Sequence, residues 1–451
     1  MVSDMNDNTK PLFEQYETAV SYIMEIPRFS AKNDPLQTAE FLKLVGEDTD
    51  ACVIHVAGTN GKGSVCAYLN SVYRCQGRKT GMFTSPHLVD IRERIRINDE
   101  LISKEDFVKC ANRIMVLTEE FDKTHTGYHP SFFEFLFFMA VYWFGINRVD
   151  VAIYETGLGG RLDATNSLTH KDICVITSIG MDHMEYLGNT IREIAGEKAG
   201  IIQKGVPVVF CDNNPEVTEV IADKAAELGA KAYPVDTCEK NICGGNKKNI
   251  DFSYKYRYDS NAIFTVQTCA HYQVNNAALA LRTLQILQGE DIIDSPQVTG
   301  GISSMFWPGR MEEIEDNVFV DGGHNVPGIE AFIESVANDG CEGKRYLLFS
   351  AVSDKQVRDM IGLLVRSELF EGIGICPIDS YRATDIAVLG RYFKECMEEC
   401  KTDIKVYEFD DTLTAYNGMC SIRRNTDDRT YICGSLYLVG AIKAIRGQTD
   451  D

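Results

Sequence analysis

The seven residues from Gly58 to Ser64, Gly-Thr-Asn-Gly-Lys-Gly-Ser, have the composition of a loop that binds phosphate. Its glycines let the backbone turn tightly, so that several N–H groups can point at one anion, while Lys62 adds a mobile positive charge. Ser64 can bind Mg²⁺ through its hydroxyl. The spacing departs from the usual Walker pattern, because Gly63 separates Lys62 from Ser64. The loop still predicts a site for a nucleotide phosphate, with a chance glycine-rich turn as the alternative.

A second candidate is the carboxylate of Glu155, which follows the apolar run 149–154. A strand that ends there places Glu155 at the carboxyl edge of a parallel sheet, where ligands bind, and a carboxylate suits a hard cation such as Mg²⁺. The alternative is a carboxylate that caps a neighbouring helix. From spacing alone, His183 is a core or substrate histidine, and Lys198, near the start of a helix, is a solvated lysine.

Short β-type runs alternate with helical patterns in the first half of the chain, which predicts a parallel sheet with helices on both faces. The loop at Gly58 follows one such strand and precedes a helix. The expected strands are 52–57, 80–84, 149–154, 173–179 and 206–210, and the expected helices are 62–75, 132–144 and 274–287. Residues 239–260 are polar and aromatic, which indicates a hairpin or an insertion at the edge of the first domain.

Two domains are expected, because 451 residues are too many for one ordinary core. A break around 295–301 and the turn Trp307-Pro308-Gly309-Arg310 separate them, and we predict domains 1–300 and 301–451. The expected strands of the second domain are 318–320, 346–349, 373–376, 404–407 and 431–433. The predicted class is α/β, with a P-loop-type, mostly parallel sheet domain followed by a smaller Rossmann-like α/β domain.

The net charge of −21 argues against a general binder of nucleic acid or anionic membrane, because its field would repel phosphates. A small anionic substrate stays compatible, since a few cations can reverse the sign inside a cleft. The apolar stretch 135–144 is far shorter than the roughly 20 residues that span a bilayer, and residues 1–10 have no targeting core. The fifteen cysteines, Cys396 and Cys400 among them, are interpreted as reduced thiols of a cytoplasmic protein.

Further blocks follow the loop in order and extend over most of the chain. They are Thr84-Ser85-Pro86-His87-Leu88, Glu155 to Asn166 (Glu-Thr-Gly-Leu-Gly-Gly-Arg-Leu-Asp-Ala-Thr-Asn), Asp182-His183, Gly196-Glu197-Lys198-Ala199-Gly200, Trp307 to Arg310, Asp321-Gly-Gly-His324-Asn325 and Gly434-Ser435-Leu436. Together with the loop, these blocks resemble the Mur ligase superfamily, and specifically its folylpolyglutamate and dihydrofolate synthases. The Glu155 to Asn166 block is specific to this folate branch.

The resemblance implies ATP as a co-substrate, two Mg²⁺ sites and a modified lysine. Ser85 and Glu155 would hold one ion, with Ser64 beside them, and His183 would hold the second. Lys198 matches a lysine that is carbamylated in relatives (N6-carboxylysine), which turns a cation into an anion near the second ion. A monovalent cation is a further ligand that the resemblance allows. The candidate catalytic residues are Lys62, His183, Lys198 and Arg310.

The remaining blocks imply binding sites for the nucleotide, the folate and the incoming amino acid. The ATP-binding candidates are Gly58, Thr59, Asn60, Gly61, Lys62, Gly63, Ser64, Asn276, Arg310 and Asp321. The folate- or pteroate-binding candidates are Ser131, Phe132, Phe133, Glu134, Leu162, Asp163 and Ala164. Further candidates, for the glutamate or the intermediate, are His324, Ser350, Asp354, Lys355 and Arg382.

Several of these side chains have an ordinary alternative role. Asn276 would be an amide on a helix surface, Arg310 a turn arginine, Asp321 a helix N-cap, and Phe132 and Phe133 plain core residues. The chain also departs from the usual family pattern at positions 323, 326 and 353–356, but none of these changes removes a group that the chemistry needs.

The implied activity is an ATP-dependent amide ligation that adds L-glutamate to the γ-carboxylate of folyl-polyglutamates through an acyl phosphate. The same machinery also allows the ligation of glutamate to dihydropteroate. The nearest alternative is a related ligase acting on a cell-wall precursor or an amino-acid polymer, and a nucleotide-dependent switch is the alternative from another class. The expected partners are small molecules, namely folate or dihydropteroate, L-glutamate and ATP. We expect a monomer that binds no nucleic acid and no membrane.

Overall fold

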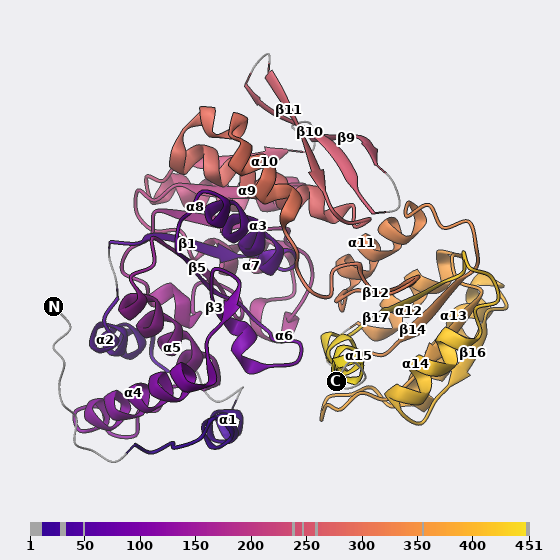
Figure 1. The fold of residues 1–451 in the computed structure, drawn as a ribbon, viewed down its shortest axis with the longest axis horizontal. Helices are drawn as coiled ribbons and strands as arrows, with labels where there is room; N and C mark the ends of the chain where they lie inside the picture. The colour runs from indigo at the N-terminus through magenta and orange to yellow at the C-terminus, as the bar shows by residue number, and fades with distance from the viewer. Residues whose placement is uncertain are drawn as a thin grey trace.

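The computed structural model describes residues 11–27, 33–47, 50–236, 240–245, 248–257, 260–353 and 356–447. Within these ranges the chain forms two α/β bodies, each built around its own sheet (Figure 1). The first body is coloured from indigo through magenta to coral, and the second from orange to yellow. No helix in the described part of the chain is long and apolar enough to cross a membrane.

The first sheet has eight strands in the order β4-β3-β2-β5-β1-β6-β7-β8. The strands are β1 (Cys52–Ala57), β2 (Thr80–Phe83), β3 (Ile95–Ile97), β4 (Glu100–Leu101), β5 (Val151–Glu155), β6 (Ile173–Ile176), β7 (Val208–Asp212) and β8 (Ala232–Asp236). Six neighbouring strands of this sheet are parallel, namely β2, β5, β1, β6, β7 and β8. The remaining two, β3 and β4, form an antiparallel edge beside β2. The predicted parallel sheet is confirmed, with β1 and β5 buried at its centre.

Helices cover both faces of this sheet, because its strands are apolar on both sides. One face packs against α3 (Lys62–Cys75), α9 (Tyr272–Gln288) and α10 (Pro296–Ser304). The other packs against α1 (Tyr16–Glu25), α2 (Pro35–Val45), α4 (Lys104–Asp122), α5 (Phe132–Asn147), α6 (Met184–Leu187), α7 (Ile191–Ala199) and α8 (Pro215–Glu227). Most of the apolar stretch 135–144, in α5, is buried in this core.

A small antiparallel sheet projects from the first body, at the top of Figure 1. Its strands are β9 (Lys240–Gly245), β10 (Ile250–Arg257) and β11 (Ser260–Val266). The expected hairpin within 239–260 is confirmed, and the unforeseen strand β11 extends it. Phe252, Tyr254 and Phe264 attach the sheet to the core beside α9, and the Tyr254 hydroxyl donates to Gln285 Oε1 at 2.7 Å.

The second body has a six-stranded sheet in the order β12-β13-β17-β14-β15-β16, parallel except for β12. Its strands are β12 (Glu312–Glu315), β13 (Val318–Val320), β14 (Arg345–Phe349), β15 (Gly372–Ile375), β16 (Lys405–Glu408) and β17 (Arg429–Cys433). Helices α11 (Val326–Ala337), α12 (Val357–Arg366) and α13 (Ile386–Cys400) cover one face, and α14 (Thr412–Ser421) and α15 (Leu436–Gly447) cover the other. All five strands predicted for this half are present.

The expected break around 295–301 is wrong, because these residues belong to α10. Ser295 caps the helix by accepting from the Gln297 N–H, and Pro296 occupies its first position, where no N–H is needed. Gly301 lets α10 pack closely against α3, because a Cβ at this position would lie 2.5 Å from the Cα of Val72. The second sheet begins only at Glu312, so we propose the stretch after Ser304 as the domain junction, slightly beyond 300/301.

Candidate functional site

A cleft of about 1910 Å³ lies where the carboxyl ends of the two sheets face each other. Its walls contain the loop after β1, residues after β5 and β6, the start of α5, and the segments that follow β13 and β17. Open α/β sheets bind ligands outside the carboxyl ends of their strands. The cleft therefore lies where both sheets present their loops.

The predicted phosphate loop spans the end of β1 and the start of α3, as expected. Its backbone is held by the segment that follows β6, because the N–H groups of Thr59 and Asn60 donate to Ser178 O at 2.9 and 3.4 Å. Gly61 has a φ of +91°, and a Cβ at this position would lie 2.3 Å from Asn276 Oδ1. Only glycine fits both the left-handed backbone and this close approach. Asn276 is thus buried against the loop, and the helix-surface alternative is wrong.

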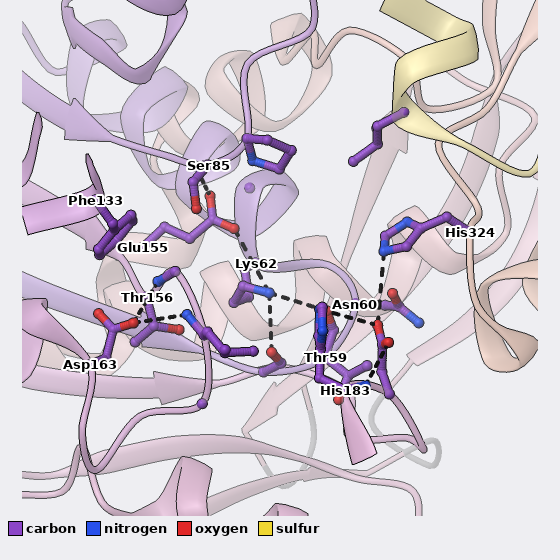
Figure 2. Close-up of a pocket in the computed structure, with 18 of the residues that line it drawn as sticks. Thr59, Asn60, Lys62, Ser85, Phe133, Glu155, Thr156, Asp163, His183 and His324 are labelled. Atoms are coloured by element: carbon purple, nitrogen blue, oxygen red, sulfur yellow. Dashed lines mark hydrogen bonds and ion pairs between the residues drawn. The ribbon is translucent and has the colours of Figure 1, made fainter. Parts of the chain in front are cut away.

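The Lys62 side chain points back toward the first residues of the loop (Figure 2). Its Nζ donates to the carbonyl oxygens of Gly58 and Thr59, both at 3.1 Å, and lies 3.9 Å from Glu155 Oε1. The ammonium group therefore lies between the loop backbone and the carboxylate that ends β5. From this position one cation could contact both a phosphate at the loop and the Glu155 carboxylate.

Glu155 ends β5 and points its carboxylate into the cleft, as the sequence predicted (Figure 2). Its Oε2 accepts from the backbone N–H of Ser85 at 3.1 Å. Burial raises the pKa of Glu155 to about 6, and the charge of Lys62 opposes this shift. A cation at this carboxylate would favour its ionised form, since burial penalises an uncompensated negative charge.

The residues around Glu155 fit Mg²⁺. The hydroxyl oxygens of Ser64 and Ser85 line the same cleft, and Ser64 Oγ is oriented by a 3.2 Å hydrogen bond from Gln273 Nε2. Mg²⁺ prefers oxygen ligands and usually combines one or two carboxylates with water and substrate phosphates. Among the described residues, no group of three His, Cys, Asp or Glu side chains is arranged to hold a metal ion by itself.

Lys198 lies near the end of α7, so its predicted place near a helix start is wrong. It is 3% exposed, which also excludes the solvated alternative. Its Nζ donates to Gly58 O at 2.8 Å, at the first residue of the phosphate loop. Burial, followed by the charge of Lys62, lowers the pKa of Lys198 to about 7. A lysine with this pKa is partly neutral near pH 7, which makes its amine nucleophilic.

His183 lies beside the loop in the left-handed conformation, with φ of 50°. Its Nε2 is 4.0 Å from Asp182 Oδ2, and the same oxygen is 3.8 Å from His324 Nε2 in the second body. Asp182 also accepts from Asn325 Nδ2 at 2.8 Å. Two histidines, one from each body, therefore flank one buried carboxylate, and Figure 2 shows the His324 ring pointing toward it.

Arg310 and Asp321 lie at the junction of the two bodies and line the cleft. Asp321 follows β13 and is 2% exposed. It accepts from the Tyr272 hydroxyl of α9 at 2.5 Å and from the Met311 N–H at 3.0 Å. Burial raises the pKa of Asp321, while Arg310 opposes the shift. The N-cap alternative for Asp321 is wrong, because Asn325 caps α11.

The segment 131–134 forms the cleft wall at the start of α5. Ser131 and Glu134 make a capping box, in which Glu134 accepts from the Ser131 N–H at 2.8 Å. The Glu134 carboxylate also accepts from the Thr38 hydroxyl at 2.8 Å, which ties α2 to α5. Phe132 lies under Arg94 at 5.2 Å, and the Phe133 ring packs directly on the Gly157 backbone. These side chains line the cleft as well as the core.

Residues 162–164 form the adjoining wall. Leu162 is 43% exposed, and Asp163 is buried and caps the short helix η2 (Ala164–Ser167). Asp163 Oδ2 accepts from the N–H groups of Gly157 and Leu158, at 2.9 and 2.8 Å. Its carboxylate therefore closes the loop 157–163 from inside.

The structure places only some of the residues predicted to hold the glutamate or the intermediate at the cleft. His324 and Arg382 line the cleft, and Arg382 lies 3.4 Å from the Tyr437 hydroxyl. Ser350 is fully buried and does not belong to the cleft wall. Asp354 and Lys355 lie outside the described residues.

Sequence reasoning missed the polar contacts that join distant segments at the cleft. Asn325, Tyr272 and Gln273 were not predicted as site residues, although Asn325 shows one local signal. An Asn followed two residues later by Pro is a common helix start, and this one also contacts the phosphate loop. The partners of Tyr272 and Gln273 are 49 and 209 residues away, so no local pattern could identify them.

Comparison with known proteins agrees with this geometry. The family model of the Mur ligase middle domain matches residues 56–284. The Bacillus subtilis (strain 168) dihydrofolate synthase/folylpolyglutamate synthase is 35% identical over 361 residues, covering 78% of this chain and 83% of that protein. The Schizosaccharomyces pombe probable dihydrofolate synthetase is 31% identical over 417 residues, covering 89% and 95%.

A solved structure extends the comparison to the whole fold. The Mycobacterium tuberculosis folylpolyglutamate synthase complexed with ADP superposes with a TM-score of 0.84 at 26% identity, covering 96% of this chain and 98% of that one. The family model covers most of the first body, while the relatives and the solved structure extend over both bodies. The chain belongs to the folylpolyglutamate and dihydrofolate synthase family of Mur ligases.

Proposed function

We propose that this protein is an ATP-dependent ligase that adds L-glutamate to the γ-carboxylate of tetrahydrofolyl-polyglutamates, and that it also converts dihydropteroate to dihydrofolate. One observation carries the proposal: a single cleft brings the phosphate loop, Glu155 and Lys198 of the first body to Arg310 and Asp321 of the second. A nucleotide bound at the loop would therefore face groups from both sheets.

The reaction needs an activated acceptor, because a carboxylate does not react with an amine in neutral water. Transfer of the γ-phosphoryl group of ATP makes an acyl phosphate, the amine of glutamate attacks it, and phosphate leaves. We assign Lys62, Arg310 and the N–H groups of the loop to offset the charge of the phosphates during this transfer. Ser64, Ser85 and Glu155 would hold Mg²⁺, which would supply further charge neutralisation.

We assign the second Mg²⁺ site to His183 and Lys198, with Lys198 in its carbamylated form. The buried amine has the properties that the reaction with CO₂ requires, since its pKa of about 7 leaves a neutral fraction at physiological pH. Carbamylation would also replace a buried positive charge with a negative one beside Lys62, which relieves the repulsion between the two lysines. We assign the 131–134 and 162–164 segments to the pteroate ring.

The alternative ligases of this superfamily differ in the molecule that accepts the amino acid. Both relatives compared above have names that refer to folate or dihydrofolate, which favours a folate over a cell-wall precursor. A simple nucleotide switch would bind ATP without forming an amide, and it would need neither the second metal site nor Arg310. We also propose that the enzyme acts as a monomer.

We propose that the enzyme works in a reducing, cytoplasmic compartment. The cysteines in the described part of the chain are all free, and several of them, such as Cys66 and Cys174, are fully buried. Free thiols persist where glutathione and thioredoxin keep them reduced. The net charge of −21 further supports small-molecule substrates rather than nucleic acid.

The decisive experiment measures ADP release with and without glutamate, with tetrahydrofolate or dihydropteroate offered in parallel. We expect release only when both glutamate and a folate acceptor are present. Lys62→Ala should reduce it by about a hundredfold or more, because a phosphate-binding cation is lost. Lys204→Ala, on the exposed surface, is the control. Full activity of Lys62→Ala, or release without any acceptor, would overturn the proposal.

A further inference from the structure

A buried histidine lies behind the cleft wall, outside the groups assigned to phosphate transfer. His55 is in β1, three residues before the phosphate loop, and its side chain is fully buried. β1 is a central strand that pairs with β5 on one side and β6 on the other. A polar ring at such a position needs an explanation, since buried polar groups cost free energy unless they are hydrogen-bonded.

His55 is the first member of a chain of hydrogen bonds that leads outward to the cleft. Its Nε2 lies 2.7 Å from the Thr165 hydroxyl in η2. The Thr165 hydroxyl donates its single proton to Asp163 Oδ1 at 2.6 Å. A hydroxyl that donates to a carboxylate can only accept from the imidazole, so His55 carries its proton on Nε2. The order of donation is therefore His55 to Thr165 to Asp163.

The other oxygen of Asp163 completes the path to the cleft wall. Asp163 Oδ2 accepts from the backbone N–H groups of Gly157 and Leu158. The Phe133 ring packs on Gly157, where a Cβ would come within 2.7 Å of the ring. The side chain of Asp163 therefore sets the shape of the loop 157–163 and the surface on which Phe133 lies. Figure 2 shows Asp163 and Phe133 on the same side of the cleft.

Within the described residues, Nε2 makes the one hydrogen bond of the His55 ring. Nδ1 is buried and has no hydrogen-bond partner among the described residues. Burial and the nearby charge of Lys171 lower the pKa of His55 well below its usual value, which keeps the ring neutral. An apolar side chain of similar size would fill the space without an unpaired nitrogen, so packing alone does not explain this residue.

We propose that His55 and Thr165 are positioning residues for the acceptor substrate: they orient Asp163, which holds the loop 157–163 and Phe133 in the conformation that binds the pteroate ring. The inference rests on the proposed function, because it takes this wall as the folate side of the cleft. It assigns His55 no contact with ATP or with the transferred phosphate, although it lies three residues from the loop.

The test compares two pairs of variants. Thr165→Val removes the hydroxyl and keeps the shape, whereas Thr165→Ser keeps the hydroxyl. His55→Leu removes the donor, whereas His55→Gln retains an N–H near the position of Nε2. We expect Thr165→Val and His55→Leu to raise the KM for the folate acceptor about tenfold, with the KM for ATP within about twofold of wild type. Thr165→Ser and His55→Gln should stay within about threefold for both substrates.

A purely structural role would give a different result. Loss of folded protein would lower the apparent kcat and the unfolding temperature, and it would leave both KM values unchanged. That result, or an equal rise in both KM values, would overturn the inference. If His55→Leu does not fold, the Thr165 pair decides alone, because Val keeps the shape of threonine without its hydroxyl, whereas Ser keeps the hydroxyl without the methyl group. Wild-type enzyme without folate-dependent activity would instead contradict the proposed function, so the two failures are distinguishable.

Discussion

Asn60 of the phosphate loop and Asn325 of the second body exchange two side-chain hydrogen bonds across the cleft. Asn60 Nδ2 donates to Asn325 Oδ1 at 2.9 Å, and Asn325 Nδ2 donates back to Asn60 Oδ1 at 3.1 Å. Asn325 also caps α11, by accepting from the Gly328 N–H at 2.8 Å. The proposed phosphate loop is thus joined directly to a helix start of the other body. Closure of the two bodies and the shape of the loop should therefore depend on each other.

Asn325→Asp should separate these two roles. A carboxylate keeps the cap on α11 but can donate nothing to Asn60, and it places a second negative charge beside Asp182. We expect kcat/KM for ATP to fall about a hundredfold, equivalent to about 2.7 kcal/mol. Asn338→Asp, the same change at the exposed far end of α11, should leave it unchanged. Steady-state ADP release measures both, and equal activities would show that the amide pair is dispensable.

Gly61→Ala should abolish tight nucleotide binding. The new Cβ would lie 2.3 Å from Asn276 Oδ1 at a residue with φ of +91°, so the loop must move. Gly205 is the matched control, because its φ is +75° but nothing lies within 4 Å of a Cβ there. Calorimetric titration with ADP should show at least about a tenfold loss of affinity for Gly61→Ala. Gly205→Ala should keep its affinity for ADP and lose only about 1 kcal/mol of folding stability through backbone strain. Similar affinities for both variants would mean that the loop tolerates the side chain.

Magnesium should stabilise the nucleotide complex through Glu155. A ligand that binds only the folded state raises the unfolding temperature, and removal by a chelator reverses the rise. We expect Mg²⁺ to raise the Tm of the wild-type ADP complex by several degrees, roughly the effect of 1–2 kcal/mol. Glu155→Gln should lose most of this increment, and Glu227→Gln, on the exposed end of α8, should keep it. An undiminished response in Glu155→Gln would place the ion elsewhere.

Carbamylation of Lys198 should increase with pH. Only the neutral amine reacts with CO₂, and the pKa of Lys198 is about 7, lowered by burial and by Lys62. At a fixed CO₂ pressure, the carbamate should therefore be scarce below pH 6 and abundant at pH 8. The stability of the unmodified protein should also increase with pH. Below about pH 7 the buried charge of Lys198 destabilises the folded state, and this cost fades as the pH rises toward the pKa of lysine in the unfolded chain.

Carbon-13 spectroscopy with labelled CO₂ tests this pH dependence directly. One carbamate signal should appear in the wild type with a midpoint near pH 7 and should be missing in Lys198→Met. Active enzyme at pH 8 without that signal would contradict the modification. The measurement needs no catalytic turnover, so it separates the chemistry of Lys198 from the identity of the substrate.

Much of the architecture followed from local pattern. The strands at 52–57 and 149–154 are short apolar runs, and the loop at Gly58 combines glycines with a lysine between a strand and a helix, so periodicity and composition identify them. The same local reasoning missed α10, because Ser295-Pro296 and Gly300-Gly301 look like a break in the sequence. The reason for a glycine at 301 is the backbone of Val72, a contact that no window around Gly301 contains.

The sequence by itself determined the two-sheet α/β class, the phosphate loop and the position of Glu155 at a strand end, since each depends on neighbours along the chain. Tertiary structure alone decided that Lys198 is buried against Gly58, that Asn325 pairs with Asn60 and that His55 supports Asp163 through Thr165. Burial and hydrogen bonding join residues that are more than a hundred positions apart in these contacts. Such pairings arise only when the strands assemble, because the sheet order brings together loops that are distant along the chain.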